Sequence, residues 1–246
     1  MNNFKIIANW KMNGSKEEVK SWINFFKDNV EHKNHSDCFF CPPACYLNNA
    51  NEIISSYNLK LNLGSQDLDP DSDNPSTGGI NGKMLKDLGC DYVLIGHSER
   101  RSLFSEDEEV LLKKLTSAVK HELKVIYCVG ETKEQKERGL ATEAIKIQLK
   151  ILKGLPVDLI SVAYEPVWSI GQGITPSLDS IDEMHQTIKD ELKSILNTEE
   201  NIAISYGGSV SADNAVSISS LNSVDGLLIG GASLNPESFS KVVNNI

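Results

Sequence analysis

The chain has 246 residues, of which 40% are hydrophobic and 24% are charged, as is usual for a globular protein with a sizeable core. Its formal net charge of −10 argues against nucleic acid or an anionic membrane surface as a partner. A small anionic ligand is still compatible with this charge, because a few backbone N–H groups and one lysine can bind a phosphate. An α/β barrel of this length commonly forms one domain, so we expect residues 1–246 to be a single domain.

The N-terminal segment lacks the basic region, apolar core and cleavage site of a signal peptide, and no apolar run approaches the roughly 20 residues that span a bilayer. The five cysteines are Cys38, Cys41, Cys45, Cys90 and Cys128. Two prolines interrupt the cluster at residues 38–45, and no second cysteine or histidine pair completes a metal site. We therefore expect buried free thiols in a reducing cytoplasm, with neither a metal nor an organic cofactor.

Short apolar runs alternate with helical patterns along the whole chain. The strand-like runs cover residues 4–9, 38–41, 59–65, 92–95, 125–129, 159–163, 202–206 and 227–229. The first helical pattern follows a capping box at residues 15–18 and places Val19, Trp22, Ile23, Phe26 and Val30 on one face. Helical patterns also occupy the other segments between the runs.

Capping residues mark several helix starts. Ser105 opens a Ser-Glu-Asp-Glu sequence and predicts the start of a helix that runs to about residue 121. Thr175 with Pro176, and Asn235 with the proline after it, predict two further starts. We expect the helical stretch at residues 131–153 to break at Gly139.

Eight strand–helix units with no linker between them predict an α/β fold of the (β/α)8 barrel type, with an open doubly wound sheet as the weaker alternative. Several of the runs are continuously apolar, which is typical of parallel strands buried on both faces. In such barrels the active site is formed by the loops that follow the carboxyl ends of the strands. Residues directly after the strands are therefore the candidates for chemistry.

Polar side chains suited to proton transfer follow three of the strands. Asn9 ends the first strand and Lys11 comes shortly after it, His97 follows the fourth strand, and Glu165 follows the sixth. His97 stands at the expected start of a short helix, whose positive end disfavours the imidazolium and would keep the ring neutral. Each of these residues alone could be solvated or structural. Together at one end of a barrel, they predict a catalytic site with Glu165 as the base.

Glu165 begins a segment with the composition of a hinged lid. Pro166 favours extended geometry at Glu165, Trp168 follows, and Gly171 and Gly173 lie before the next expected helix. Stiff ends around a glycine-containing centre suit a lid that closes over a substrate.

Two glycine pairs follow the seventh and eighth strands, at Gly207-Gly208 and Gly230-Gly231. Glycines before a helix start let backbone N–H groups approach an anion. The loops after strands seven and eight are also where barrels commonly bind phosphate. Each pair alone could be a tight turn, but the two together predict a phosphate site.

Five motifs, in this order along essentially the whole chain, resemble those of the triosephosphate isomerase family. They are residues 8–13 (Ala-Asn-Trp-Lys-Met-Asn), 96–101 (Gly-His-Ser-Glu-Arg-Arg), 163–168 (Ala-Tyr-Glu-Pro-Val-Trp) with Ile170-Gly171, 206–210 (Tyr-Gly-Gly-Ser-Val) and 229–233 (Ile-Gly-Gly-Ala-Ser). The resemblance implies the glycolytic and gluconeogenic interconversion of dihydroxyacetone phosphate and glyceraldehyde 3-phosphate through an enediolate. It implies no metal and no cofactor.

The resemblance also implies a role for each candidate. Lys11, His97 and Glu165 would be the catalytic residues. The residues that bind substrate would be Asn9, Lys11, Gly171, Ser209, Gly230 and Gly231. Glu99 would support the lysine, and Tyr206 would steady the closed lid.

Two loops depart from the family pattern. Gln172 and Ile174 stand in the lid where the family usually has threonine and lysine, which puts the opening rate of the lid in question. Family members are usually homodimers in which the loop around Thr77 enters the partner's pocket, and here Gly79 stands where a glutamate is common. We expect a homodimer through the loop around Thr77 that lacks this carboxylate.

Two other functions stay open from the residues. A non-catalytic phosphate-binding barrel should lack at least one of Lys11, His97 and Glu165, and none is missing. Another barrel enzyme, such as an aldolase, would need a Schiff-base lysine on an inner strand, and the run at 125–129 contains none.

Overall fold

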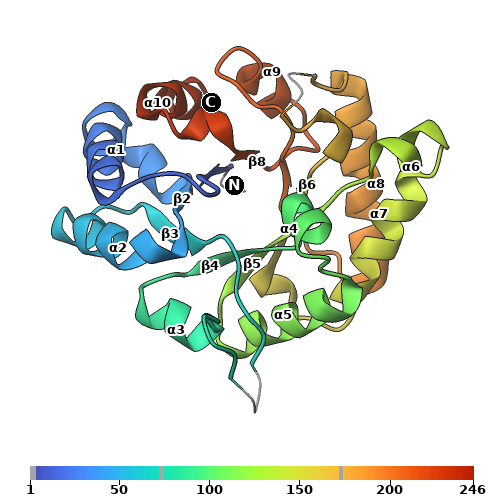
Figure 1. The fold of residues 1–246 in the computed structure, drawn as a ribbon. Coiled ribbons are helices and arrows are strands. Elements are labelled where there is room, and N and C mark those ends of the chain that lie inside the picture. The colour runs from blue at the N-terminus through green and yellow to red at the C-terminus, as the bar shows by residue number, and fades with distance from the viewer. Residues whose placement is uncertain (1–3, 72–74, 172–173) are drawn as a thin grey trace.

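The computed structural model describes residues 4–71, 75–171 and 174–246. Eight parallel strands close into a barrel in sequence order, and helices surround it (Figure 1). The strands are β1 (Lys5–Asn9), β2 (Cys38–Cys41), β3 (Asn62–Ser65), β4 (Tyr92–Ile95), β5 (Lys124–Val129), β6 (Ile160–Tyr164), β7 (Ile204–Tyr206) and β8 (Gly226–Ile229). The predicted barrel is confirmed, although β3 and β7 are shorter than their apolar runs.

Ten α-helices lie in the described segments between and after the strands. They are α1 (Lys16–Asn29), α2 (Leu47–Ser56), α3 (Gly82–Asp87), α4 (Ser98–Leu103), α5 (Glu108–Lys120), α6 (Lys133–Glu137), α7 (Ala141–Leu149), α8 (Leu178–Leu196), α9 (Ala215–Ser219) and α10 (Pro236–Asn245). The predicted break at Gly139, whose φ is 70°, separates α6 from α7. None of the described helices is long and apolar enough to cross a membrane.

The strands are buried on both faces, as their apolar runs predict. Inside the barrel, residues such as Ile7, Leu94 and Ile126 form one apolar cluster. Outside it, alternate strand residues pack against the helices, and the predicted face of α1 supplies Trp22 and Phe26 to this larger cluster. The alternation follows from strand geometry, in which successive side chains point to opposite faces. Two buried serines interrupt the apolar strands, Ser161 on β6 and Ser205 on β7.

Ser105 does not start a helix, contrary to the prediction. Helix α5 begins after Asp107, whose carboxylate accepts a hydrogen bond from the N–H of Val110 at 2.9 Å. Ser105 instead has a left-handed backbone with φ of 54°, which an N-cap residue does not adopt. Ser105 and Asp107 are both residue types that cap helices. Asp107 forms the cap, because its carboxylate reaches the N–H of Val110 three residues later.

Thr175 is also not the cap that was predicted. Helix α8 begins after Ser177, whose hydroxyl accepts from the N–H of Ser180 at 3.2 Å. Pro176 disfavours helical geometry at the residue before it, so Thr175 lies outside the helix. Its hydroxyl donates instead to the carbonyl oxygen of Ser209 at 3.3 Å. The prediction for α10 was correct, with Asn235 as the cap.

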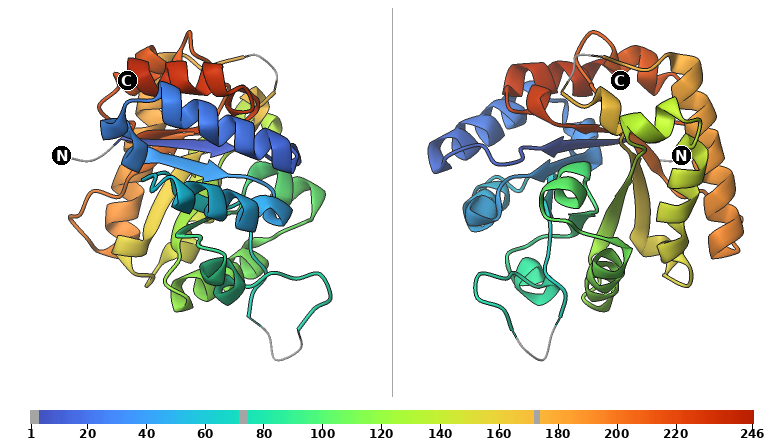
Figure 2. Two further views of the ribbon diagram at one scale, coloured as in Figure 1. Left: turned by 90° about the vertical axis from the view of Figure 1, so that its left-hand side faces the viewer. Right: turned by 45° about the vertical axis from the view of Figure 1, so that its right-hand side comes forward.

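The segment between β3 and α3 starts at the barrel and then leaves it. Gln66 bonds to the carbonyl oxygen of Lys11 and Leu68 is buried in the core, whereas the described residues 75–79 lie away from the ring of helices (Figure 2). The side chains of residues 75–78 are exposed. This is the segment around Thr77 from which the sequence predicts subunit contact.

Candidate active site

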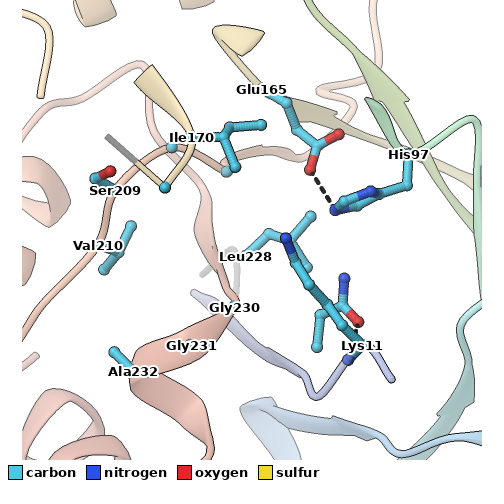
Figure 3. A pocket seen from close by; sticks show the side chains of 14 residues that line it. Lys11, His97, Glu165, Ile170, Ser209, Val210, Leu228, Gly230, Gly231 and Ala232 are labelled. Carbon is cyan, nitrogen blue, oxygen red and sulfur yellow. Dashed lines mark hydrogen bonds and ion pairs between the residues drawn. The ribbon is translucent and has the colours of Figure 1, made fainter. Parts of the chain in front are cut away.

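One cavity of about 240 Å³ lies at the carboxyl end of the barrel, lined by residues that directly follow the strands (Figure 3). All the residues that the sequence predicts to be catalytic or to bind substrate line it: Asn9, Lys11, His97, Glu165, Gly171, Ser209, Gly230 and Gly231. They come from segments up to 222 positions apart (231 − 9). The two supporting residues, Glu99 and Tyr206, lie outside the cavity lining.

Glu165 is buried at the cavity, with an exposed fraction of 2%. Its Oε1 atom lies 3.0 Å from Nε2 of His97, and its Oε2 atom accepts a hydrogen bond of 3.0 Å from the N–H of Ser98. Burial favours the protonated carboxyl, but His97 and the Ser98 N–H outweigh it, so the pKa of Glu165 lies below its ordinary value. The side chain is therefore a desolvated carboxylate rather than a solvated surface charge.

His97 is the N-cap residue of α4, as its position in the sequence predicts. Its Nδ1 atom accepts the N–H of Glu99 at 3.2 Å, which requires that Nδ1 carry no proton. Burial lowers the pKa of His97, yet the facing Glu165 carboxylate raises it further, and the net pKa lies above the ordinary value. The helix start therefore favours the neutral ring with its proton on Nε2, as expected, and the Glu165 carboxylate acts against this preference.

Lys11 reaches into the cavity from the loop after β1 (Figure 3). Its ammonium forms an ion pair of 2.6 Å with Oε1 of Glu99, which is the support the sequence predicts. Its backbone N–H donates to the side-chain oxygen of Asn9 at 3.1 Å. A Cβ atom on Gly230 would lie 4.0 Å from the ammonium nitrogen, so the positive charge stands beside the second glycine pair.

Both glycine pairs line the cavity. Gly230 and Gly231 lie on the side opposite Glu165 and His97 (Figure 3), whereas a Cβ atom on Gly207 would lie 3.0 Å from Cγ of Glu165. Gly230 precedes a 3-10 turn at Gly231–Ser233, where unpaired N–H groups are expected at the start. A Cβ atom on Gly208 would overlap the hydroxyl of Tyr206, so a larger residue would not fit there. Backbone N–H groups, a nearby ammonium and small residues make this side of the cavity suited to a phosphate.

A family model described as triosephosphate isomerase matches residues 4–246 of the chain. The chain is 41% identical to a triosephosphate isomerase of Finegoldia magna, 38% identical to one of Aquifex aeolicus and 39% identical to one of Francisella tularensis subsp. novicida. The first two alignments cover 97% of both chains, and the third covers 97% of this chain and 95% of its relative. The chain belongs to the triosephosphate isomerase family. The sequence resemblance is thereby confirmed.

In this member of the triosephosphate isomerase family, Ser209 lies between the two ends of the expected lid. Its hydroxyl donates to the carbonyl oxygen of Ser169 at 2.8 Å, and its own carbonyl accepts from Thr175 at 3.3 Å. Gly171, which lines the cavity, has φ of 68°, a conformation that favours glycine. Of the predicted lid residues, Gln172 and Gly173 lie outside the described residues, and Ile174 is 54% exposed.

Glu131 is a further residue at the site of this triosephosphate isomerase family member, and the sequence reasoning missed it. Its Oε1 atom accepts hydrogen bonds from Trp168 at 2.6 Å and from the hydroxyl of Tyr164 at 3.2 Å. It therefore holds the first turn of the lid to the end of β6. A signal for it was present, since Glu131 directly follows the fifth strand and its Gly130.

Tyr206 is fully buried on β7 behind Gly208. Burial raises the pKa of its hydroxyl to about 12, with the Ser169 hydroxyl acting against this rise. Tyr206 thus stays neutral and lies close to the first turn of the lid. This placement is compatible with the predicted steadying of the lid and equally with a structural role.

Four of the five cysteines are buried and Cys45 is exposed, so the expectation of buried thiols is wrong at that residue. All five thiols are free. Within residues 4–71, 75–171 and 174–246, no group of three or more His, Cys, Asp or Glu side chains has the arrangement of a metal site.

Proposed function

We propose that Glu165, His97 and Lys11 carry out the isomerisation of the family, the interconversion of dihydroxyacetone phosphate and glyceraldehyde 3-phosphate, in one catalytic domain that comprises residues 1–246. The observation that carries the proposal is a buried carboxylate, an imidazole and an ammonium around one cavity whose far side is built of glycines. A base, two electrophiles and a phosphate cradle are what this reaction needs.

In the proposed mechanism, the Glu165 carboxylate removes a proton from the carbon next to the substrate carbonyl. The electron pair moves to the carbonyl oxygen and gives an enediolate. The proton of the neighbouring hydroxyl group then passes to the former carbonyl oxygen, and the same carboxyl group returns its proton to the former carbonyl carbon. General base catalysis supplies about 10²–10⁴-fold, whereas enzymes commonly reach at least about 10⁶-fold. Donors aimed at the developing oxyanion, worth roughly 10²–10³-fold each, supply much of the remainder.

Substrate binding has to separate Glu165 from His97, because Oε1 of Glu165 and Nε2 of His97 lie 3.0 Å apart and are paired with each other. Separation frees the Nε2–H of His97 for the substrate oxygens and the carboxylate for the C–H bond. It also removes the main contribution that raises the pKa of His97, so burial then favours the neutral ring. A neutral imidazole donates a hydrogen bond without giving up its proton outright.

The phosphate would be held by backbone N–H groups of Gly171, Ser209, Gly230 and Gly231, with Asn9 lining the same pocket. Lys11 would offset the negative charge of the substrate and enediolate, supported by its 2.6 Å ion pair with Glu99. Closure of the lid would exclude water and strengthen these interactions. Holding the phosphate would also suppress its elimination from the enediolate.

The test is a coupled assay with glyceraldehyde 3-phosphate on the wild-type protein beside Glu165→Ala. Rapid wild-type turnover that falls by at least about 10²-fold in kcat in the variant supports both the reaction and the base. An inactive wild type that still binds a phosphate-bearing enediolate mimic would support a binding protein instead. Equal turnover by both proteins would exclude Glu165 as the base.

We also propose that the protein is a homodimer through the loop around Thr77. The exposed residues 75–78 and the strongly exposed apolar side chains of Met12, Leu103 and Phe104 support this, since exposed apolar groups often mark interfaces. Sedimentation velocity should give twice the monomer mass of 27.1 kDa, and Thr77→Asp should weaken the association. A monomer at all concentrations would contradict the proposal.

The proposed location is the cytoplasm, and the five free thiols support it. Cell fractionation with an antibody to the protein tests this location, and recovery from a membrane or secreted fraction would contradict it.

A further inference from the structure

Lys11 has an unusual backbone for a residue of its type, with φ of 53°. A side chain with a Cβ atom pays a steric cost in this left-handed region, so the conformation persists only where the surroundings hold it. In the described residues, the other non-glycine residues of this kind, Asn58, Ser105, Glu122 and Asn197, all lie away from the cavity lining. Among these residues with a left-handed backbone, Lys11 is the one that lines the cavity.

Gln66 supplies the contacts that hold this backbone. Its side-chain amide donates from Nε2 to the carbonyl oxygen of Lys11 and to that of Cys41, each at 2.9 Å. On the other side, the N–H of Lys11 donates to the Asn9 side chain at 3.1 Å. The peptide groups before and after the Lys11 Cα are therefore both fixed, and one amide group joins the loop after β1 to the end of β2.

Gln66 is itself held in place by the residues next to it. The hydroxyl of Ser65 donates to the carbonyl oxygen of Asp67 at 2.7 Å. The carboxylate of Asp67 pairs with the buried ammonium of Lys114 at 2.7 Å and with Arg100 at 2.8 Å. The main chain of Gln66 thus lies between two anchored residues, and its amide is held by its two hydrogen bonds.

The same anchor reaches the ammonium of Lys11. Arg100, which pairs with Asp67, directly follows Glu99, and Glu99 pairs with Lys11 at 2.6 Å. The main chain and the side-chain charge of Lys11 are therefore held by two segments that are joined to each other by ion pairs. Loss of the Gln66 bonds would let the backbone relax and carry the ammonium away from the glycines at Gly230.

We infer that Gln66 is a positioning residue that acts through Lys11, by holding its left-handed backbone so that the ammonium faces the bound phosphate and enediolate. The inference rests on the proposed function for its catalytic consequence. It does not rest on that function for its structural consequence, which is the backbone conformation of Lys11 itself.

The test is a double-mutant cycle with glyceraldehyde 3-phosphate as substrate. Gln66→Met keeps the volume of the side chain and removes the donor, and Lys11→Met removes the charge on which Gln66 is inferred to act. We expect Gln66→Met to lower kcat/KM about tenfold in the wild-type background, with a rise in KM, and less than about twofold in the Lys11→Met background. Equal losses in the two backgrounds, or no loss in the wild type, would overturn the inference.

Asn62→Ala is the matched control. Asn62 lies at the other end of β3, and its side-chain amide also donates to a carbonyl oxygen of β2, that of Cys38, at 3.0 Å. This variant should leave kcat/KM within about twofold of wild type. If Gln66→Met does not fold, Gln66→Glu, which keeps the shape and replaces the donor with an acceptor, takes its place in the cycle.

A crystal structure of Gln66→Met gives a readout that needs no activity. We expect Lys11 to leave the left-handed region, and an unchanged positive φ would overturn the inference even if the wild type proved inactive. An inactive wild type whose Gln66→Met structure has a relaxed Lys11 would instead refute the proposed function and leave the positioning role supported.

Discussion

Nε2 of His97 and Oε1 of Glu165 lie 3.0 Å apart at the base of the cavity, and both side chains are almost completely buried. Each group changes the proton affinity of the other. The pKa of Glu165 is lowered despite its burial, and that of His97 is raised despite its burial. The contact with His97 therefore keeps Glu165 in its carboxylate form.

This relationship predicts that His97→Gln raises the pKa of Glu165. The variant removes the largest contribution that lowers the pKa, while burial, which raises it, remains. Carbon-13 NMR of the glutamate carboxyl group, titrated from pH 3 to 8, measures the change. Lys11→Met provides the comparison, because Lys11 contributes less to the lowering and should give a smaller upward shift. A larger shift in Lys11→Met than in His97→Gln would contradict the assignment of the pair.

Gly130→Ala should impair catalysis, although Gly130 is not among the residues that line the cavity. A Cβ atom at this position would overlap the carbonyl oxygen of Glu165, so the end of β6 would have to move. A displacement of about 1 Å at a reacting group costs on the order of 10²-fold in rate, and we expect a fall in kcat of this order.

Gly154→Asn is the control for that experiment. Gly154 has a positive φ, 84°, a Cβ atom there would meet nothing within 4 Å, and asparagine tolerates this conformation. Steady-state kinetics should give wild-type kcat for Gly154→Asn. Full kcat in Gly130→Ala would mean that the strand end accommodates the added methyl group without moving Glu165.

Acid sensitivity of the fold should depend on His185. This residue is fully buried on α8 and packs against Tyr164 and Tyr206. Burial lowers the pKa of His185 from 6.5 to about 4, so between these values the unfolded chain binds a proton that the folded chain does not. The free energy of unfolding should therefore keep its full value above pH 6.5. It should fall by up to about 1.4 kcal/mol per pH unit as the pH is lowered from 6.5 towards 4.

Urea unfolding at a series of pH values measures this dependence. His185→Phe should flatten the slope between pH 6.5 and 4, because the replacement has no proton to bind. His32→Gln, which changes an exposed histidine, should leave the slope as in the wild type. A His185→Phe variant with the wild-type slope would assign the acid sensitivity to other groups.

The main part of the site can be predicted from the sequence, because a barrel brings the carboxyl ends of all its strands together. Once eight parallel strands are identified, the residues after each strand must meet at one end. Asn9, His97, Glu165 and Gly230 could therefore be brought together from the sequence, and the structure finds them around one cavity.

The features of the site that the sequence does not predict depend on contacts between loops that lie far apart along the chain. Gln66 bonds to a carbonyl 55 positions away, and Trp168 bonds to Glu131 across 37 positions. Neither bond has a local pattern of spacing or propensity, since each depends on the register of neighbouring strands. The left-handed backbone of Lys11 has the same origin. The two wrongly predicted caps, Ser105 and Thr175, are local errors. In each case a polar residue two positions later, Asp107 or Ser177, forms the cap.

The role of Glu165 is tested by isomerisation of glyceraldehyde 3-phosphate in deuterium oxide, followed by proton NMR of the product and of the remaining substrate. A proton held on the Glu165 carboxyl group can exchange with solvent before it is returned to carbon. We expect deuterium on the carbon that receives the proton with the wild-type protein, and no deuterium above background with Glu165→Gln. Product formed at full rate by Glu165→Gln, without deuterium in the product of either protein, would indicate direct hydride transfer between the carbons and would contradict the role of Glu165 as the base.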